Sequence, residues 1–196
     1  APPAKDAPQS KKPQLPTPPK VIVDPEGNQY FRQQMLGQGG FARVFQVTDP
    51  FGQDRAFKVI AKSAIMQSRK NRQKILAEIM IHKSLNHHHI VKFEDMFEDA
   101  ENVYFVLELC HNGNMNDIVK RRGRYTEPEA RYFMVQILSG CQNMHRNSVI
   151  HRDLKLGNVF LDKDMQVKIG DFGLAALLKY PEERKKTVCG TPNYIA

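Results

Sequence analysis

The sequence has no tryptophan and only three cysteines among its 196 residues. Cys110, Cys141 and Cys189 lie far apart, and no Cys-x-x-Cys spacing occurs. This pattern argues against a disulfide framework or a structural zinc site and favours a reducing compartment. No apolar run approaches the roughly 18 residues of a membrane-spanning helix, and no charged-then-apolar signal segment is present. We therefore expect an intracellular protein with no membrane partner.

Acidic residues are outnumbered, which leaves a net charge of +8. A basic balance can indicate nucleic acid or an anionic surface as partner. Here the positive residues form patches without interleaved aromatic residues, which is typical of solvated surface, so we expect no nucleic-acid partner. The patches are Lys5, Lys11, Lys12 and Lys20, then 69–74, 121–124 and 184–186.

Proline is concentrated at the start of the chain, where residues 1–20 hold seven of the twelve prolines. A segment of this composition cannot bury enough apolar surface to offset its chain entropy. We expect residues 1–20 to be a disordered leader and residues 21–196 to form one domain. A change of composition near residue 110 divides that domain into 30–110 and 111–196.

Hydrophobic patterns predict an α+β fold. In the first part we expect five strands and one helix, the strands at 30–36, 42–48, 55–60, 91–97 and 103–109 and the helix at 68–86. In the second part we expect a helix at 115–122 and short strands at 159–161 and 167–169. Thr126, Pro128 and Glu129 predict the capped start of a longer helix that ends near Arg146, with Phe133, Ile137, Leu138 and Met144 on its buried side.

A glycine-rich loop, 37–40, lies between two predicted strands. Glycines let backbone N–H groups approach a phosphate, although any tight hairpin also favours glycine. A dinucleotide-binding motif would need a helix directly after the loop. Residues 43–47 alternate like a strand instead, which predicts a hairpin folded over a nucleotide, with Val44 against the base.

Lys58 lies in the middle of the apolar strand segment Ala56-Phe57-Lys58-Val59. A buried ammonium group needs a negative partner. Glu78, in the middle of the following helix, and the phosphates of a nucleotide are both candidates. Lys58 could also extend its ammonium group to solvent.

Two loops carry the strongest signal. His151-Arg152-Asp153-Leu154-Lys155-Leu156-Gly157-Asn158 offers Asp153 as acceptor for a hydroxyl proton and Asn158 as an oxygen ligand for magnesium. Asp171-Phe172-Gly173 follows a predicted strand, and Asp171 can hold magnesium between two phosphates. Either aspartate alone could be a turn residue.

Together these motifs, in this order, resemble the protein kinase signature from about Tyr30 to Ala196. The resemblance implies a bilobal fold with a five-stranded antiparallel N-lobe, one helix and a mainly helical C-lobe that this chain holds only in part. It implies ATP and Mg²⁺ as cofactors and protein serine or threonine as substrate. It also implies that Lys58 contacts the α/β-phosphates and pairs with Glu78, that Lys155 steadies the γ-phosphate, and that Thr191 contacts Asp153 and Lys155.

The same resemblance implies a set of nucleotide-binding residues. Leu107 would gate the pocket, Phe160 would form its floor, and the backbone of Glu108 and Cys110 would bond adenine. The implied set comprises Leu36, Gly37, Gln38, Gly39, Gly40, Phe41, Ala42, Val44, Ala56, Lys58, Glu78, Leu107, Glu108, Cys110, Phe160 and Asp171.

Ala42 in the nucleotide loop, Lys-Leu-Gly-Asn at 155–158 and the segment 183–196 are similar to polo-like kinases, the regulators of cell division. Val44 departs from the cysteine that is common in that group, while the leader and 24–30 are more similar to its fungal or yeast-type members. The resemblance implies nuclear and spindle-pole localisation. It also implies that an upstream kinase phosphorylates Thr187 and that Arg152 binds the phosphate.

Two alternatives stay open at this point. A phosphotransferase for small molecules would share the aspartates and Asn158 but has little use for Thr187 or for Gly190-Thr191-Pro192. A pseudokinase-like fragment would bind a nucleotide or a partner without catalysis. The polar residues expected for catalysis are all present, which disfavours this alternative: Lys58, Glu78, Asp153, Asn158 and Asp171. Transfer of phosphate to casein or to small alcohols would separate these alternatives.

Overall fold

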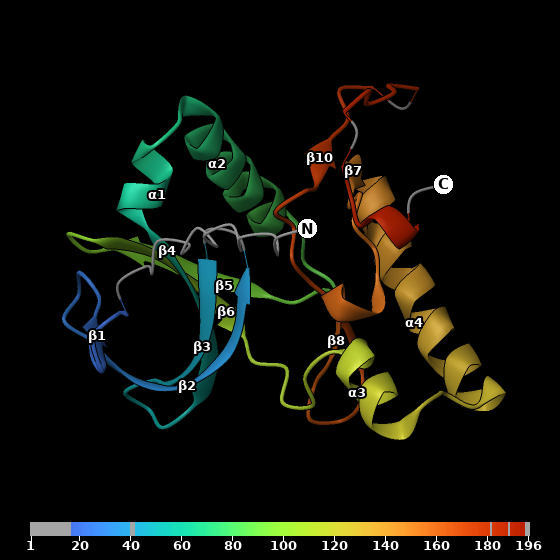
Figure 1. Cartoon of the computed structure of the whole chain (residues 1–196), viewed down its shortest axis with the longest axis horizontal. Helices are drawn as coiled ribbons and strands as arrows, with labels where there is room; N and C mark the ends of the chain where they lie inside the picture. The colour runs from blue at the N-terminus through green and yellow to red at the C-terminus, as the bar shows by residue number, and fades with distance from the viewer. Residues whose placement is uncertain (1–16, 40–41, 181, 188, 195–196) are drawn as a thin grey trace, which may run out of the picture.

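The computed structural model describes residues 17–39, 42–180, 182–187 and 189–194. These residues form two lobes that lie side by side in Figure 1, with a sheet and two helices in one lobe and α4 along the other. The N-lobe sheet of the described residues is antiparallel with strand order β1-β2-β3-β4-β6-β5. Its strands are β1 (Val21–Val23), β2 (Gln29–Gly39), β3 (Ala42–Thr48), β4 (Asp54–Ala61), β5 (Phe93–Glu98) and β6 (Asn102–Glu108).

Alternation along the strands gives the sheet two covered faces. One face buries an aromatic-rich core that includes Phe45, Phe57 and Tyr104, with Ile22 of β1 packed against it. The opposite face carries a second cluster around Phe105, which packs against α1 (Lys62–Met66) and α2 (Arg69–Ser84). The nucleotide-site residues of β3 and β4 lie on this second face.

β1 is an addition to the five predicted N-lobe strands. Asp24 explains it, because its carboxylate accepts hydrogen bonds from the N–H groups of Glu26 and Asn28 and so turns the chain back into β2. Residues 17–20 belong to the predicted leader, yet Pro18 is buried and the Lys20 carbonyl accepts from Arg32 N–H. The rest of the predicted leader, 1–16, lies outside the described residues.

The sequence predicts only one of the two N-lobe helices. α2 follows the prediction closely, and the Ser68 side chain caps it by accepting from Lys70 N–H. α1 is missing from the prediction, since its five residues are too few to show helical periodicity.

The C-lobe core is built from short elements around one long helix. Its buried side chains include Met144, Leu161, Ile169 and Phe172. The elements are α3 (Met115–Arg122), α4 (Glu127–Arg146), β7 (Val149–Ile150), η1 (Leu156–Asn158), β8 (Val159–Leu161), β9 (Val167–Ile169), β10 (Ala176–Leu177) and η2 (Pro192–Tyr194). None of the helices in the described ranges has the length and apolar character that crossing a membrane requires.

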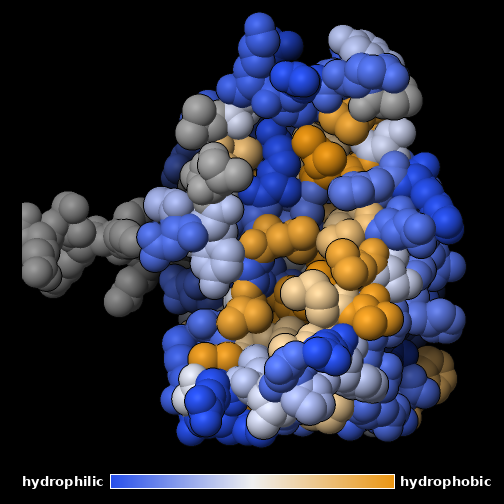
Figure 2. Space-filling model, turned by 90° about the vertical axis from the view of Figure 1, so that its right-hand side faces the viewer, coloured by the Kyte–Doolittle hydropathy of each residue, from blue (hydrophilic) through white to orange (hydrophobic). Residues whose placement is uncertain are grey.

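α4 begins as predicted, with Thr126 and Glu129 forming a complete capping box. Phe133 and Met144 are buried, and Ile137 is half-buried against the core. The expectation for Leu138 is wrong, because its side chain is 61% exposed. Figure 2 shows apolar side chains gathered on the side of the molecule where α4 lies, and the exposed large apolar residues of α4 are Tyr132, Met134, Val135 and Leu138.

Candidate active site

The predicted nucleotide loop joins β2 to β3, and Gly37–Gly39 lie within β2. Gly40 and Phe41 lie outside the described residues. Leu36, before the loop, is 45% exposed, whereas Ala42 after it packs against the cluster around Phe105. The described glycines at 37 and 39 have open space where a side chain would begin, so no neighbouring side chain obstructs the approach of a ligand to this backbone.

Register places the predicted pocket residues on one face of the sheet. Val44 pairs with Lys58, and Ala56 pairs with Leu107, so all four side chains share a face. Ala56 is buried, while Val44 and Leu107 are half-buried. Three strands thus present a small, mainly apolar surface beside the ammonium group of Lys58.

Lys58 connects the N-lobe helix to the Asp-Phe-Gly loop. Its Nζ lies 2.5 Å from Oε1 of Glu78 and 3.3 Å from Oδ1 of Asp171. Burial alone would lower the pKa of Lys58, but the two carboxylates outweigh it and raise the pKa. Burial would likewise raise the pKa of Asp171, but Lys58 reverses that effect and lowers it. Lys58 and Asp171 therefore stay charged at neutral pH.

The catalytic-loop residues predicted from sequence also come together, and the expected contacts of Thr191 are confirmed. Thr191 Oγ1 donates to Asp153 Oδ1 at 2.7 Å, and Lys155 Nζ donates to Thr191 Oγ1 at 2.7 Å. Lys155 Nζ also lies 2.9 Å from Asp153 Oδ2. Burial alone would raise the pKa of Asp153, but Thr191 and Lys155 outweigh it and lower the pKa. Asp153 is thus held as a carboxylate.

Asn158 and Asp171 offer the oxygen atoms that magnesium prefers. The amide nitrogen of Asn158 donates to the carbonyl oxygen of Asp153 and, at 3.0 Å, to its Oδ2. This leaves the amide oxygen of Asn158 as its atom for a cation. Asp171 has a half-exposed side chain and a left-handed backbone with φ of 60°, directly after buried Gly170. A divalent cation that takes its remaining ligands from phosphates fits this donor set.

Phe160, the predicted pocket floor, is half-buried beside Gly170. A side chain at Gly170 would begin 3.0 Å from the Phe160 ring and 3.0 Å from Val91. Only glycine at this position lets the strand before Asp171 approach Phe160 so closely. The close contact fixes the height of the Asp-Phe-Gly loop relative to the predicted floor.

A column of four aromatic rings, which the sequence did not predict, spans the two lobes. The His82 ring of α2 lies 5.3 Å from Phe93 and 4.5 Å from Phe172, and His151 lies 5.2 Å from Phe172. His82 Nε2 bonds the carbonyl of Val91 at 2.7 Å. Burial, opposed by this hydrogen bond, lowers the pKa of His82 to about 4, so the imidazole is neutral at physiological pH. Its place four residues after Glu78 on the same helix was the available signal.

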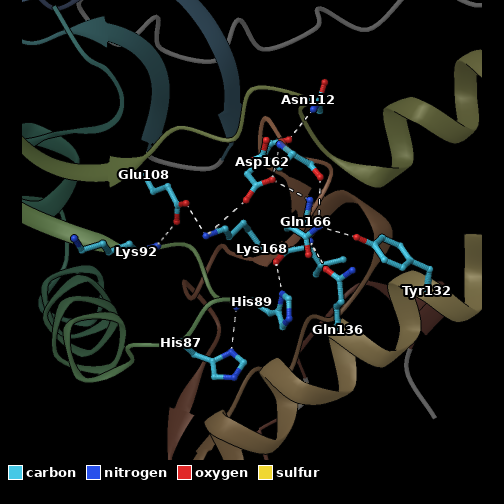
Figure 3. Close-up of polar contacts among 12 residues, drawn as sticks. His87, His89, Lys92, Glu108, Asn112, Tyr132, Gln136, Asp162, Gln166 and Lys168 are labelled. Carbon is cyan, nitrogen blue, oxygen red and sulfur yellow. Dashed lines mark hydrogen bonds and ion pairs between the residues drawn. The ribbon is translucent and has the colours of Figure 1, made fainter.

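A polar network lies behind the connection between the lobes (Figure 3). Lys168 Nζ of β9 lies 2.6 Å from Oε1 of Glu108, the last residue of β6, and 4.0 Å from Oδ2 of Asp162. The Glu108 carboxylate also accepts from Lys92 N–H at 3.1 Å. No feature of the local sequence predicts a role for Lys168, because its partner lies 60 residues away.

The backbone at this connection limits which groups could bond adenine. The N–H of Glu108 donates to the carbonyl of Lys92, and the carbonyl of Cys110 accepts from Gly113 N–H. These two bonds do not use the Glu108 carbonyl or the Cys110 N–H. Burial raises the pKa of the Cys110 thiol to about 12, so this half-buried cysteine stays protonated.

Arg152 and Thr187 line one cavity of about 390 Å³ beside the catalytic loop. Arg152 has a left-handed backbone with φ of 65°, and its Nε donates to the Leu174 carbonyl at 2.7 Å. Thr187 is exposed. The predicted regulatory pair therefore faces the same space, together with Cys189 and Tyr194.

Comparison with known proteins agrees with this arrangement. Residues 30–196 match the protein kinase domain family. The chain is 54% identical over 180 residues to the cell cycle serine/threonine-protein kinase CDC5/MSD2 of Saccharomyces cerevisiae, an alignment covering 92% of this chain and 25% of the relative. It is 50% identical over 180 residues to the serine/threonine-protein kinase PLK1 of Xenopus laevis, covering 91% of this chain and 30% of that protein.

A third relative is the serine/threonine-protein kinase polo of Drosophila melanogaster, 49% identical over 167 residues that cover 85% of this chain and 29% of the relative. The chain thus spans between 25% and 30% of the length of these curated relatives. The family match covers most of the chain, and the chain has about half of its aligned residues in common with polo-like kinases. The chain belongs to the protein kinase family.

Proposed function

We propose that the protein transfers the γ-phosphoryl group of ATP to serine or threonine hydroxyls of proteins in the control of cell division. One observation supports this most directly: the Lys58–Glu78–Asp171 group is assembled, and so is the Asp153–Lys155–Thr191 group. A nucleotide-binding module without catalysis would have no need of the second group.

In the proposed reaction the substrate hydroxyl oxygen attacks the γ-phosphorus of ATP, the bond to ADP breaks, and the hydroxyl proton passes to Asp153. Because the pKa of Asp153 is lowered, its carboxylate mainly orients the hydroxyl and accepts the proton late in the transfer. Lys155 would steady the γ-phosphate, and Lys58 the α/β-phosphates. Asn158 and Asp171 would hold Mg²⁺, which neutralises phosphate charge when bound.

We further propose that adenine lies between Val44 and Ala56 above and Phe160 below, with Leu107 at the back and Leu36 at the rim. The Glu108 carbonyl and the Cys110 N–H would bond its edge. The backbone of 37–42, which includes Gln38, Gly40 and Phe41, would cover the phosphates. The shared face of Val44, Ala56 and Leu107 supports this placement.

Regulation at Thr187 and localisation in the nucleus and at spindle poles also belong to the proposal. Thr187 and Arg152 line one cavity. A phosphate placed there by an upstream kinase would add about −1.5 to −2 charge and bind the guanidinium group. The proposal for localisation depends on the likeness to polo-like kinases alone.

Asp153→Asn tests the proposed reaction. In the full-length protein, we expect transfer of labelled phosphate to casein to fall by about 10² to 10⁴-fold, while ATP affinity changes little. Asp164→Asn, in an exposed turn, serves as the control and should transfer phosphate as the wild type does. Retained transfer by Asp153→Asn would refute the role of this residue, and wild-type transfer to small alcohols but not to casein would favour the small-molecule alternative.

A further inference from the structure

The N-terminal strap, residues 17–23, crosses the N-lobe sheet and is anchored at two places. Pairing of β1 with β2 holds one end, where Ile22 is buried in the core. At the other end the hydroxyl of Thr17 accepts a hydrogen bond of 3.3 Å from Nη1 of Arg43, and Pro18 is buried. The strap therefore ends at β3, next to the strand residues that follow the nucleotide loop.

Two guanidinium groups lie together at this end of the strap. The Cζ atoms of Arg32 and Arg43 lie 5.1 Å and 5.7 Å from the centroid of the same Phe45 ring. Arg32 Nε also donates to the Pro19 carbonyl at 3.2 Å. Burial, followed by the charge of Arg32, lowers the pKa of Arg43. An anion on the Thr17 oxygen would begin within hydrogen-bond distance of Arg43 and two residues from the carbonyl that Arg32 bonds.

Thr17 carries the chemistry to become that anion. Its side chain is exposed, Pro18 follows it directly, and Lys20 lies three residues on. A threonine followed by proline, with a basic residue shortly after, is the acceptor pattern of proline-directed protein kinases. The hydrogen bonds from Arg43 to Thr17 and from Arg32 to the Pro19 carbonyl hold this end, so the strap has to separate from both arginines to meet such an enzyme.

We propose that Thr17 is a phosphorylation site, and that its phosphate binds the guanidinium groups of Arg43 and Arg32 and fastens the strap to the sheet. In the modification, Oγ1 of Thr17 forms a bond to the γ-phosphorus of ATP, ADP leaves, and the hydroxyl proton passes to the modifying kinase. The product carries about two negative charges and three strong acceptors, and paired guanidinium donors match a phosphate in geometry as well as charge. Fastening the strap would stabilise β3, which leads out of the nucleotide loop.

The experiment compares full-length protein carrying phosphothreonine at position 17, incorporated during expression, with the unmodified form. We expect the modified form to melt about 2 to 6 °C higher in the N-lobe transition. We expect ³¹P NMR titration to place the second pKa of the phosphate below its usual value near 6. Trypsin cleavage after Lys20 should slow by roughly tenfold, since ordering of the strap removes the extended conformation that the protease needs.

Arg43→Gln should abolish both the melting shift and the lowered phosphate pKa, whereas Arg55→Gln should preserve them, because Arg55 pairs with Glu94 and does not contact the strap. The ³¹P titration needs no variant, so a folding defect in Arg43→Gln would leave the proposal testable. An unchanged melting temperature together with a phosphate pKa near 6 would overturn it, as would a melting shift that persists in Arg43→Gln. A proline-directed kinase should label the wild type at Thr17 and leave Thr17→Ala unlabelled there; absence of label would overturn the assignment of the modifying enzyme.

Discussion

Single residues of the site hold one another in defined protonation states. Glu78, and after it Asp171, raises the pKa of Lys58, and Lys58 lowers the pKa of Asp171, although burial acts in the opposite direction on each. His82 differs, because no carboxylate bonds it and burial keeps it neutral. Two kinds of group thus lie within one site, a charged set stabilised by pairing and a buried neutral ring stabilised by packing.

His82 predicts a dependence of stability on pH. Its pKa is about 4 in the folded protein and 6.5 as the ordinary value, so the unfolded chain binds the extra proton first as pH falls. The contribution of His82 to the free energy of unfolding keeps its full value above pH 6.5. It falls by up to about 3 kcal/mol as the pH is lowered towards 4, because the unfolded chain takes up the proton more readily. Urea denaturation followed by circular dichroism at several pH values measures this slope.

His82→Leu should reduce the change of unfolding free energy with pH between pH 6.5 and pH 4, although it also removes the hydrogen bond to the Val91 carbonyl. His88→Leu, at an exposed histidine, should keep the wild-type slope. The titratable groups near the His82 ring are Lys58, Asp171 and His151, so Lys58→Met would show whether they alter the slope. Equal slopes in His82→Leu and the wild type would contradict the assignment.

The sequence was informative about residues whose chemistry is unusual for their surroundings. Lys58 in an apolar strand and Asp153 in a crowded loop stand out locally, and the structure gives both the expected neighbours. His82 and Lys168 do not stand out, because a histidine or lysine on a mixed surface is ordinary and the partner lies far along the chain.

Elements show the same division between local and distant causes. The bounds predicted from local patterns are confirmed for β3, α3, β8 and β9, and the predicted capping box marks the start of α4. β7 and β10 are missing from the prediction, since each has two residues and exists only through pairing with the other. Leu138 was misplaced because helical periodicity defines faces but does not decide which face is covered.

The segment between β10 and η2 supports a prediction about phosphorylation. In the full-length protein, Thr187→Val should lower kinase activity strongly, by about 10-fold or more, and Thr187→Asp should restore part of it, because a negative charge can bind Arg152 and order the segment. Phosphate transfer to casein measures the effect. Thr48→Val, in the N-lobe sheet, is a control for loss of a threonine hydroxyl. Equal activity in all the variants would disprove the regulatory role.

At the scale of the whole molecule, the Glu108–Lys168 ion pair joins the lobe connection to the strand before Asp171. Both side chains are mostly buried, with 25% and 13% exposed. Breaking such a pair leaves a charge with reduced solvation. We therefore expect the pair to restrict how the two lobes rotate relative to each other.

Lys168→Met should raise the KM for ATP several-fold with a smaller change in kcat, because the Glu108 backbone loses its anchor. A double-mutant cycle with Glu108→Gln, measured by urea denaturation, should give a coupling energy of about 1 to 3 kcal/mol. Lys163→Met, at an exposed position between β8 and β9, should match the wild type. Additive effects in the cycle would show that the pair contributes nothing specific.

The four-ring column also bears on how the site assembles. Phe93, His82, Phe172 and His151 come from β5, α2, the Asp-Phe-Gly loop and the His-Arg-Asp loop. When one ring is displaced, the rings on either side of it lose packing contacts. A partly formed column is therefore less stable than a fully formed one. The population of molecules therefore divides into those with the whole column formed and those without it, and intermediate forms are rare.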